Sequence, residues 1–293
     1  MKLATYQLKK AAAGPAPALG LAVGDGLIDI ARHLPAAPTG MIALMTAWAD
    51  WQAALEGLAA SRPADHALDT VTLLAPVPRP GKILAIGLNY TDHVAESGMA
   101  APTEQLWFAK MPTSVTGPHD PIDLPRFSEE LDYEAELAFV IGKRCRHVTR
   151  EDAPAAIFGY CAANDVSVRD WQLRTSQFTI GKSFDTHAPF GPWIVTADEL
   201  GDPHDLPIRC LVNGETRQDS RTSHLIFDCF AQISHLSQAM TLEPGDVILT
   251  GTPGGVGAGF TPPRFLREGD RVRVEIGGIG AIENMVRREP GRA

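Results

Sequence analysis

The sequence predicts an α+β protein that is rich in β-strands. From residue 107 onward the chain consists mostly of short apolar runs, separated by turns that are rich in glycine and proline. That pattern is typical of strands joined by tight turns. Apolar residues recur at helical spacing in only a few segments, at residues 41–58, 89–96, 153–157 and 225–240. Strands are therefore expected to supply most of the core.

A proline-rich joint divides the chain. Residues 1–30 have the pattern of short strands with turns, and residues 71–75 that of a further strand. The joint at residues 76–81 reads Pro-Val-Pro-Arg-Pro-Gly, a composition typical of domain boundaries. We therefore predict a small N-terminal α+β domain over residues 1–75 and a larger domain over residues 80–290.

Composition excludes two classes of partner. The chain has 293 residues, of which 44% are hydrophobic and 21% charged, and its formal net charge is −9. No basic run or basic stripe with interleaved aromatic residues is present, so we expect no nucleic-acid binding. No run of about eighteen apolar residues occurs, so we expect no membrane span.

The expected compartment is the cytoplasm. The four cysteines are widely spaced and form no Cys-x-x-Cys pair, which favours reduced thiols. Residues 11–23 are apolar, but glycines and prolines interrupt them and no clean cleavage site follows. We therefore expect no secretory signal.

The acidic stretch at residues 131–136 leads into an apolar run, residues 137–141, that suits a buried strand. Because strand side chains alternate, Asp132, Glu134 and Glu136 are expected to share one face. Their charges repel unless a proton or cation intervenes, and all-oxygen ligands favour Mg²⁺, Mn²⁺ or Ca²⁺. The alternative is a solvated acidic face on an edge strand.

Two further segments carry candidate site residues. Asp165 follows a probable strand at residues 157–163 and could complete a set of three carboxylates, although a turn or helix-cap aspartate is the alternative. His93 and Glu96 are i,i+3 neighbours if helical, the arrangement of a general base and its orienting carboxylate. The alternative for that pair is an exposed helical contact.

Lys182 and Thr252 are candidate contacts for an anionic substrate. Lys182 could bind a carboxylate or stabilise an enolate, or it could be an ordinary surface lysine. The loop around Thr252 lacks the ending of a nucleotide P-loop. Its backbone amides and the Thr252 hydroxyl are instead suited to meet an anion.

Five motifs in order resemble the fumarylacetoacetate hydrolase family over roughly residues 80–287. They are Gly-Leu-Asn-Tyr-x-Asp-His, Asp-Tyr-Glu-x-Glu-Leu, Asn-Asp-Val-Ser-x-Arg-Asp, Gly-Lys-Ser-Phe-Asp and Thr-Gly-Thr-Pro. Residues 183–193 and 212–215 resemble those of bacterial members that are diketo-deoxy-sugar-acid hydrolases or hydroxyheptadienedioate isomerases. The resemblance implies a mixed-sheet β-roll that is usually a homodimer.

The resemblance also implies roles for residues. It assigns the divalent metal, Mg²⁺ or Mn²⁺ with Ca²⁺ possible, to Glu134, Glu136 and Asp165, and gives Asp132 no ligand role. It assigns the base dyad to His93 and Glu96 on a short lid helix. The matched substrate or neighbouring positions are Lys182, Arg169, Gln172 and Thr252.

The implied reaction is hydrolysis of a carbon–carbon bond in a 2,4-dioxo acid, an acylpyruvate or a diketo-deoxy sugar acid. Water activated by the dyad would attack C4, and the C3–C4 bond would break to release a stabilised pyruvate enolate. The alternatives are decarboxylation of oxaloacetate-like 2-oxo acids and isomerisation of hydroxydienedioates. A non-catalytic binding protein is a third hypothesis. Residues 97–105 and 255–264 are expected to contact the substrate tail.

Overall fold

The structure, a computed structural model, describes residues 1–9, 16–92, 96 and 102–291. A large mixed sheet extends through the molecule, and a five-stranded sheet and a two-stranded sheet accompany it. The described helices are few and short, and none of them is long and apolar enough to cross a membrane. The predicted β-rich α+β fold with mixed sheets is confirmed.

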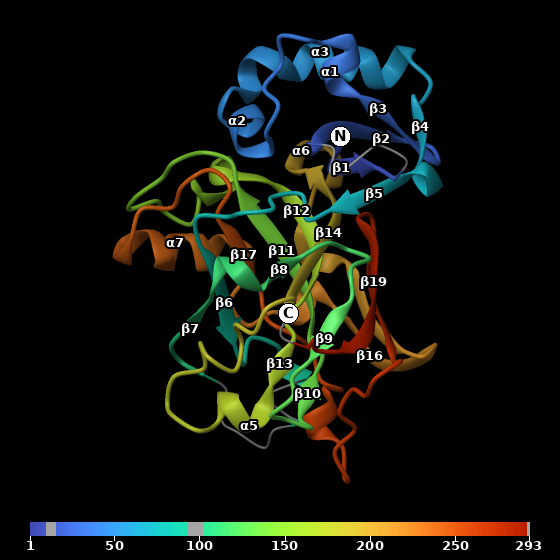
Figure 1. The fold of residues 1–293 in the computed structure, drawn as a ribbon. Helices are drawn as coiled ribbons and strands as arrows, with labels where there is room; N and C mark the ends of the chain where they lie inside the picture. Colours follow the sequence, from blue (N-terminus) through green and yellow to red (C-terminus); the bar gives the residue numbers. More distant parts are fainter. Residues whose placement is uncertain (10–15, 93–95, 97–101, 292–293) are drawn as a thin grey trace.

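The N-terminal elements form one end of the molecule, at the top of Figure 1. Its strands are β1 (Lys2–Leu8), β2 (Ala18–Val23), β3 (Gly26–Asp29), β4 (His66–Ala67) and β5 (Val71–Leu74). Its helices are α1 (Ile30–His33), α2 (Met41–Thr46) and α3 (Trp48–Ser61).

The single helix predicted over residues 41–58 is wrong in one respect, because the helix breaks at Ala47. Ala47 has φ −97° and ψ 20°, outside helical values, and it ends α2 and begins α3. The break lets Trp48 pack edge-on against Phe158, with ring centroids 4.8 Å apart. Tertiary packing of the aromatic pair thus outweighs the continuous helical spacing.

The large sheet continues across the proline-rich joint. Strand β1 pairs antiparallel with β14 (Ala188–Thr196), with Leu3 opposite Ile194. Residues 1–75 therefore add strands to the sheet of the following region. The division into domains at residues 1–75 and 80–290 stays a prediction.

The centre of the large sheet has the order β1-β14-β12-β11-β17-β6-β7. The remaining strands in it are β6 (Ile83–Gly87), β7 (Leu106–Lys110), β11 (Ala135–Ile141), β12 (Ile157–Asn164) and β17 (Val247–Leu249), and the short β8 (Val115–Thr116) pairs with β14. The pair β17–β6 is parallel and the pair β11–β12 antiparallel, so the sheet is mixed.

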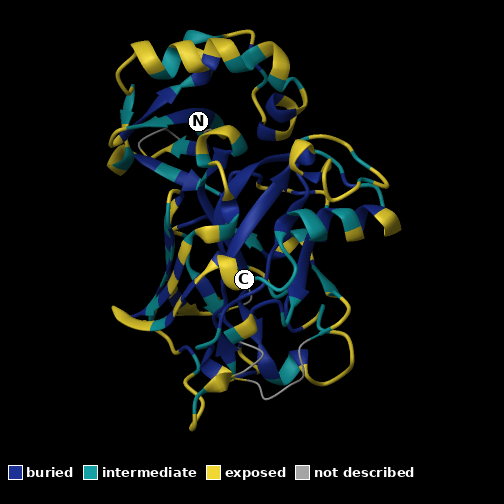
Figure 2. Ribbon diagram, turned by 180° about the vertical axis from the view of Figure 1, so that it is seen from behind, coloured by how far each residue is buried: buried dark blue, intermediate teal, exposed yellow. Residues whose placement is uncertain are grey.

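Strand β11 is buried on both faces, as Figure 2 shows in dark blue. Leu137 and Phe139 point into a core shared with the five-stranded sheet. Ala138 and Val140 point into a second core that includes α2 and α3. The two-residue alternation of a strand explains this division, and burial on both faces explains why residues 137–141 are uniformly apolar.

Most of the other elements lie in the lower part of Figure 1. The five-stranded sheet contains β9 (Ile122–Leu124), β15 (Pro207–Val212), β16 (Glu215–Arg221), β18 (Arg271–Ile276) and β19 (Gly280–Arg288). The two-stranded sheet pairs β10 (Leu131–Asp132) with β13 (Ser167–Val168). The short helices are α5 (Arg169–Gln172), α6 (Ala197–Leu200) and α7 (Cys229–Ala239).

Two predicted helices differ from the observed ones. Residues Ala153–Ala156 form a 3₁₀ turn, and Ile157 already belongs to β12. Helix α7 begins at Cys229, four residues later than predicted, because the Asp228 carboxylate caps it by accepting from the Ala231 N–H at 2.8 Å.

Candidate metal and substrate site

Three carboxylates converge where β11 begins and β12 ends. The two strands pair with Glu136 opposite Ala163, so the residue before one strand lies beside the residue after the other. The Asp165 N–H donates to the Glu134 carbonyl at 2.9 Å, which holds these two residues together. Carboxylate oxygens of Glu134, Glu136 and Asp165 lie within 4.8 Å of one another, and all three residues are buried.

Asp132 does not belong to this cluster. The prediction that Asp132, Glu134 and Glu136 share one strand face is wrong, because the strand is interrupted between β10 and β11. The Asp132 carboxylate accepts from the backbone N–H groups of Gly257 at 2.7 Å and Ala258 at 2.9 Å. It also pairs with Arg169 Nε at 2.8 Å. Its burial excludes a solvated acidic face, and its role is structural.

Burial and mutual repulsion oppose three charges in this space. Two like charges 4.8 Å apart repel by about 3 kcal/mol at an effective dielectric constant of about 20. The pKa of Glu136 is accordingly raised well above its usual value by burial and by the neighbouring Asp165 and Glu134 carboxylates. A cation is required if all three groups are to be ionised together.

Two buried lysines supply part of that positive charge. Lys182 Nζ lies 2.8 Å from both Glu134 and Asp165, which excludes an ordinary surface lysine. Lys110 Nζ lies 2.5 Å from Asp165. Burial opposes the charge of both lysines. The two carboxylates beside Lys182 outweigh burial, so the pKa of Lys182 is raised. Lys110 contacts one carboxylate, which does not outweigh burial, so the pKa of Lys110 is lowered.

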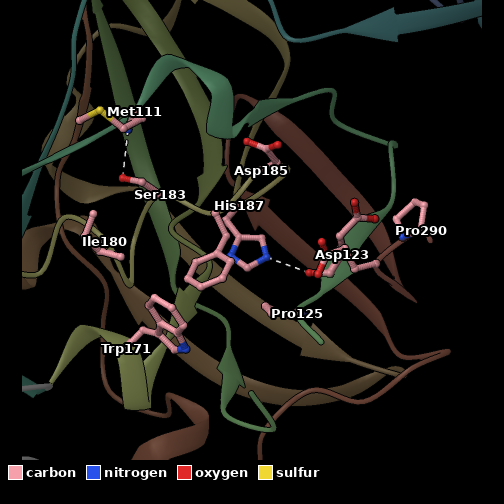
Figure 3. Close-up of a pocket in the computed structure, with 11 residues that line it drawn as sticks. Met111, Asp123, Pro125, Trp171, Ile180, Ser183, Asp185, His187 and Pro290 are labelled. Carbon is pink, nitrogen blue, oxygen red and sulfur yellow. Dashed lines mark hydrogen bonds between the residues drawn. The ribbon is translucent and has the colours of Figure 1, made fainter. Parts of the chain in front are cut away.

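Sequence reasoning did not identify Lys110. Its signal is a lysine at the end of an otherwise apolar strand, Leu-Trp-Phe-Ala-Lys. The lysine-bearing segments are tied together, because the Met111 N–H donates to Ser183 Oγ at 3.1 Å. His187 Nε2 donates to the Asp123 carbonyl at 2.9 Å and anchors the second segment to β9. Figure 3 shows both hydrogen bonds, at a pocket that Ser183 and His187 line.

Helix α5 brings Arg169 and Gln172 to the carboxylates. Arg169 Nη1 lies 2.6 Å from Glu134 and 2.9 Å from the Gln172 side-chain oxygen. Arg169 Nη2 is buried and has no hydrogen-bond partner among the residues that the structure describes. This nitrogen is therefore a donor that an anionic ligand could satisfy.

The loop after β17 contributes Thr252 to the site. The prediction that the backbone amides of this loop meet a substrate anion is only partly correct. Its Gly251 N–H donates to the Glu136 carboxylate at 2.6 Å, so this amide meets a protein anion. The Thr252 hydroxyl accepts from Gln218 Nε2 at 2.8 Å, which leaves its own proton available to a ligand. Gln218, which sequence reasoning did not identify, also accepts from the Ala135 N–H at 2.9 Å.

One member of the predicted dyad is described. Glu96 lies at the edge of the pocket, where its carboxylate accepts from the Gly255 N–H at 3.0 Å. His93 lies outside the described residues. The prediction that His93 and Glu96 form a base dyad therefore stays a prediction.

A pocket of about 660 Å³ opens beside the carboxylates and is lined by residues that include Glu96, Glu134, Lys182 and Thr252. Four buried carboxylates and three buried cations lie in and around the three-carboxylate cluster, and they are Asp132, Glu134, Glu136, Asp165, Lys110, Arg169 and Lys182. A divalent cation on Glu134, Glu136 and Asp165 would reverse the excess negative charge. The all-oxygen donors suit Mg²⁺, Mn²⁺ or Ca²⁺.

Comparison with known proteins identifies one matching family model and several similar proteins. The family model for the fumarylacetoacetate (FAA) hydrolase C-terminal region matches residues 82–287. A mitochondrial oxaloacetate tautomerase of Xenopus laevis is 43% identical over 98% of this chain and 90% of its own length. A mitochondrial oxaloacetate tautomerase of Homo sapiens is 44% identical over 92% of this chain and 87% of its own length.

Solved structures are also similar over 99% of this chain and all of theirs. Maleylpyruvate hydrolase from Sphingobium sp. SYK-6, in complex with manganese(II) and pyruvate, has a TM-score of 0.83 and 35% identity. A 5-carboxymethyl-2-hydroxymuconate delta-isomerase from Mycobacterium smegmatis has a TM-score of 0.77 and 36% identity.

Proposed function

Because this chain belongs to the fumarylacetoacetate hydrolase family, we propose that it is a divalent-metal-dependent enzyme that interconverts the keto and enol forms of oxaloacetate. Relatives named oxaloacetate tautomerases, more than 40% identical over nearly the whole chain, support this choice of substrate. The proposal replaces carbon–carbon hydrolysis, the reaction first expected from the sequence, as the leading function.

The observation that carries the proposal is the convergence of three buried carboxylates at the polar end of an open pocket. Glu134, Glu136 and Asp165 would hold Mg²⁺ or Mn²⁺. The cation, when bound, would act as a Lewis acid that polarises the 2-oxo group and so acidifies the C3 protons.

The protein's own groups bind the substrate and move a proton. Lys182 and the open Nη2 donor of Arg169 attract the anionic substrate to the polar end of the pocket. The Thr252 hydroxyl donates to a substrate oxygen. The dyad of His93 and Glu96 removes a proton from C3 and delivers a proton to the C2 oxygen, which converts the keto form into the enol, and the reverse transfers restore the keto form.

Hydrolysis of 2,4-dioxo acids is the second candidate, and the similarity to maleylpyruvate hydrolase favours it. The same dyad would take a proton from water, whose oxygen would form a bond to C4 while the C3–C4 bond breaks. C4 would leave as a carboxylic acid, and the C3 carbanion, after protonation, as pyruvate. Decarboxylation of oxaloacetate shares the enolate and differs only in losing carbon dioxide from C4.

One assay distinguishes these reactions. Metal-stripped protein is reconstituted with Mg²⁺ or Mn²⁺ and given enol-oxaloacetate, keto-oxaloacetate or 2,4-dioxopentanoate. We expect rapid loss of the enol absorbance of oxaloacetate, dependent on the metal. Release of pyruvate with acetate from 2,4-dioxopentanoate would establish hydrolysis, and release of pyruvate with carbon dioxide from oxaloacetate would establish decarboxylation. Full tautomerase activity after verified removal of metal would contradict the proposal.

A further inference from the structure

The pocket beside the carboxylates has two chemically different ends. Its polar end contains Glu134, Arg169, Gln172, Lys182 and Thr252. Apart from Glu96, the rest of the described lining is apolar, and its large side chains are Ile86, Leu88, Leu106, Phe108, Leu173, Phe178 and Val256. A substrate held by its 2-oxo acid group at the polar end must place its remaining atoms along this apolar lining.

The apolar wall begins directly beside the polar end. The ring centroid of Phe108 lies 5.0 Å from Lys182 Nζ, and Lys182 contacts two of the clustered carboxylates. Phe178 packs edge-on against Phe108, with centroids 5.9 Å apart. Leu106 lies two residues before Phe108 on β7 and so on the same face. Little room therefore separates the cations from the aromatic surface.

Positive charge in the described lining is confined to Arg169 and Lys182. The open Nη2 donor of Arg169 can accept one more anionic group near Glu134. Arg174, the cation nearest in sequence to the wall, is engaged elsewhere, because it stacks on Trp171 at 4.1 Å and bonds Asp170 at 3.2 Å. The sequence of residues 93–101 contains no lysine or arginine.

From this distribution of charge we infer that the pocket selects 2-oxo acids whose negative charge extends no further than C4. A four-carbon diacid such as oxaloacetate can place its second carboxylate on Arg169. A longer substrate must carry an uncharged, apolar tail along Phe108 and Phe178, because a distal carboxylate there would lose its water without gaining a cation from the described lining. The inference rests on the proposed function for the position of the 2-oxo acid group.

Binding of unreactive oxamates tests the inference without chemistry. N-(3-methylbutyl)oxamate and N-(2-carboxyethyl)oxamate share the 2-oxo acid group and nearly the same shape, and differ in the charge of the tail. We expect the Mn²⁺-loaded protein to bind the uncharged compound at least about tenfold more tightly in calorimetry. Equal binding, tighter binding of the acidic compound, or binding of neither would overturn the inference.

Two variants test whether Phe178 of the apolar wall causes the preference for the uncharged oxamate. Phe178→Arg should reduce or reverse the preference by pairing with the charged tail, and Phe178→Leu should retain it, with thermal unfolding used to check that both variants fold. An unchanged preference in a folded Phe178→Arg variant would remove Phe178 from the inference. The oxaloacetate assay is independent, so a protein that prefers the apolar oxamate but leaves enol-oxaloacetate unchanged would contradict the proposed function alone.

Discussion

Glu136 carries a carboxylate whose charge its surroundings oppose, since burial and two neighbouring carboxylates raise its pKa. Glu136→Ala removes one metal ligand and also relieves like-charge repulsion. We expect Mn²⁺ affinity to fall by more than the roughly 10–100-fold typical of losing an outer-shell partner, while thermal stability is retained. Calorimetric titration measures the affinity, with the exposed Glu243→Ala as control. Unchanged affinity would remove Glu136 from the ligand set.

His93 and Glu96 are predicted to move the substrate proton. His93→Ala and Glu96→Gln should each lower kcat by roughly 10²–10⁴-fold, as loss of a general base does. Glu96→Gln should be the milder change, because it keeps the shape of the side chain. The double variant should be little worse than His93→Ala, since a dyad acts as one unit.

The metal affinity of these dyad variants serves as the control. The proposed ligand set of Glu134, Glu136 and Asp165 includes neither residue, so Mn²⁺ titrations of both variants should match the parent protein. KM can rise as well if the segment orders over the substrate. Near-parental turnover in both variants would show that the pair has no part in proton transfer.

At the scale of secondary-structure elements, Asp132 joins three parts of the site. Its carboxylate links β10 to Arg169 of α5 and to two N–H groups of the Gly257 turn. Asp132→Ala leaves the Arg169 charge buried without this partner, which typically costs about 3–5 kcal/mol. We expect that loss in urea unfolding, whereas the exposed Asp219→Ala should have little effect. A loss below about 1 kcal/mol would contradict the structural role.

The stability that the contact between β9 and the Lys182 segment contributes should depend on pH through His187. Burial lowers the pKa of His187 from 6.5 to about 3. The folded-state pKa lies below the unfolded value, so the stabilising contribution of the neutral ring is complete above pH 6.5 and is lost as the pH falls toward 3. One such group contributes a slope approaching about 1.4 kcal/mol per pH unit in that range.

Unfolding in urea at several pH values between 7 and about 4.5 measures that slope. His187→Gln should reduce the pH dependence of the unfolding free energy, and the exposed His235→Gln serves as the control. Identical slopes in the parent protein and His187→Gln would show that His187 is not the titrating group.

At the scale of the whole molecule, we predict a homodimer. The described surface exposes large apolar side chains at Met111, Phe127, Leu173 and Ile180. Such side chains favour burial against a partner, and Met111 and Ile180 line the pocket of Figure 3. Light scattering should give twice the 31.5 kDa mass of one chain. Ile180→Glu should weaken association, whereas Leu8→Glu should not, and a parental protein of single-chain mass at micromolar concentration would contradict the prediction.

The cellular compartment of the protein is also predicted. The four cysteines are free thiols, and three of them are buried. Reduced thiols are compatible with the predicted cytoplasmic location. Several similar proteins are named as mitochondrial. Fractionation of cells that produce the full chain would decide between these compartments.

The sequence by itself determined the features that depend on local patterns. Alternating or continuous apolar runs predicted β11 and β12 closely, because strand formation there follows from short-range burial patterns. The carboxylates Glu134 and Asp165 flank those strands and Glu136 lies within β11, at positions that the motifs also mark. The segment 41–58 shows the limit of local spacing, because an aromatic contact with distant Phe158 divides the helix.

Only the tertiary structure decided which groups surround the carboxylates. Lys110 meets Asp165 from 55 positions away in sequence, and Asp132 accepts the Gly257 amide from 125 positions away. Gln218 reaches Thr252 across 34 positions. No periodicity marks such pairs, because they depend on strand order and register over the whole sheet. The apolar wall of Phe108 and Phe178 arises in the same way, since their rings meet only after β7 and the loop after α5 pack together.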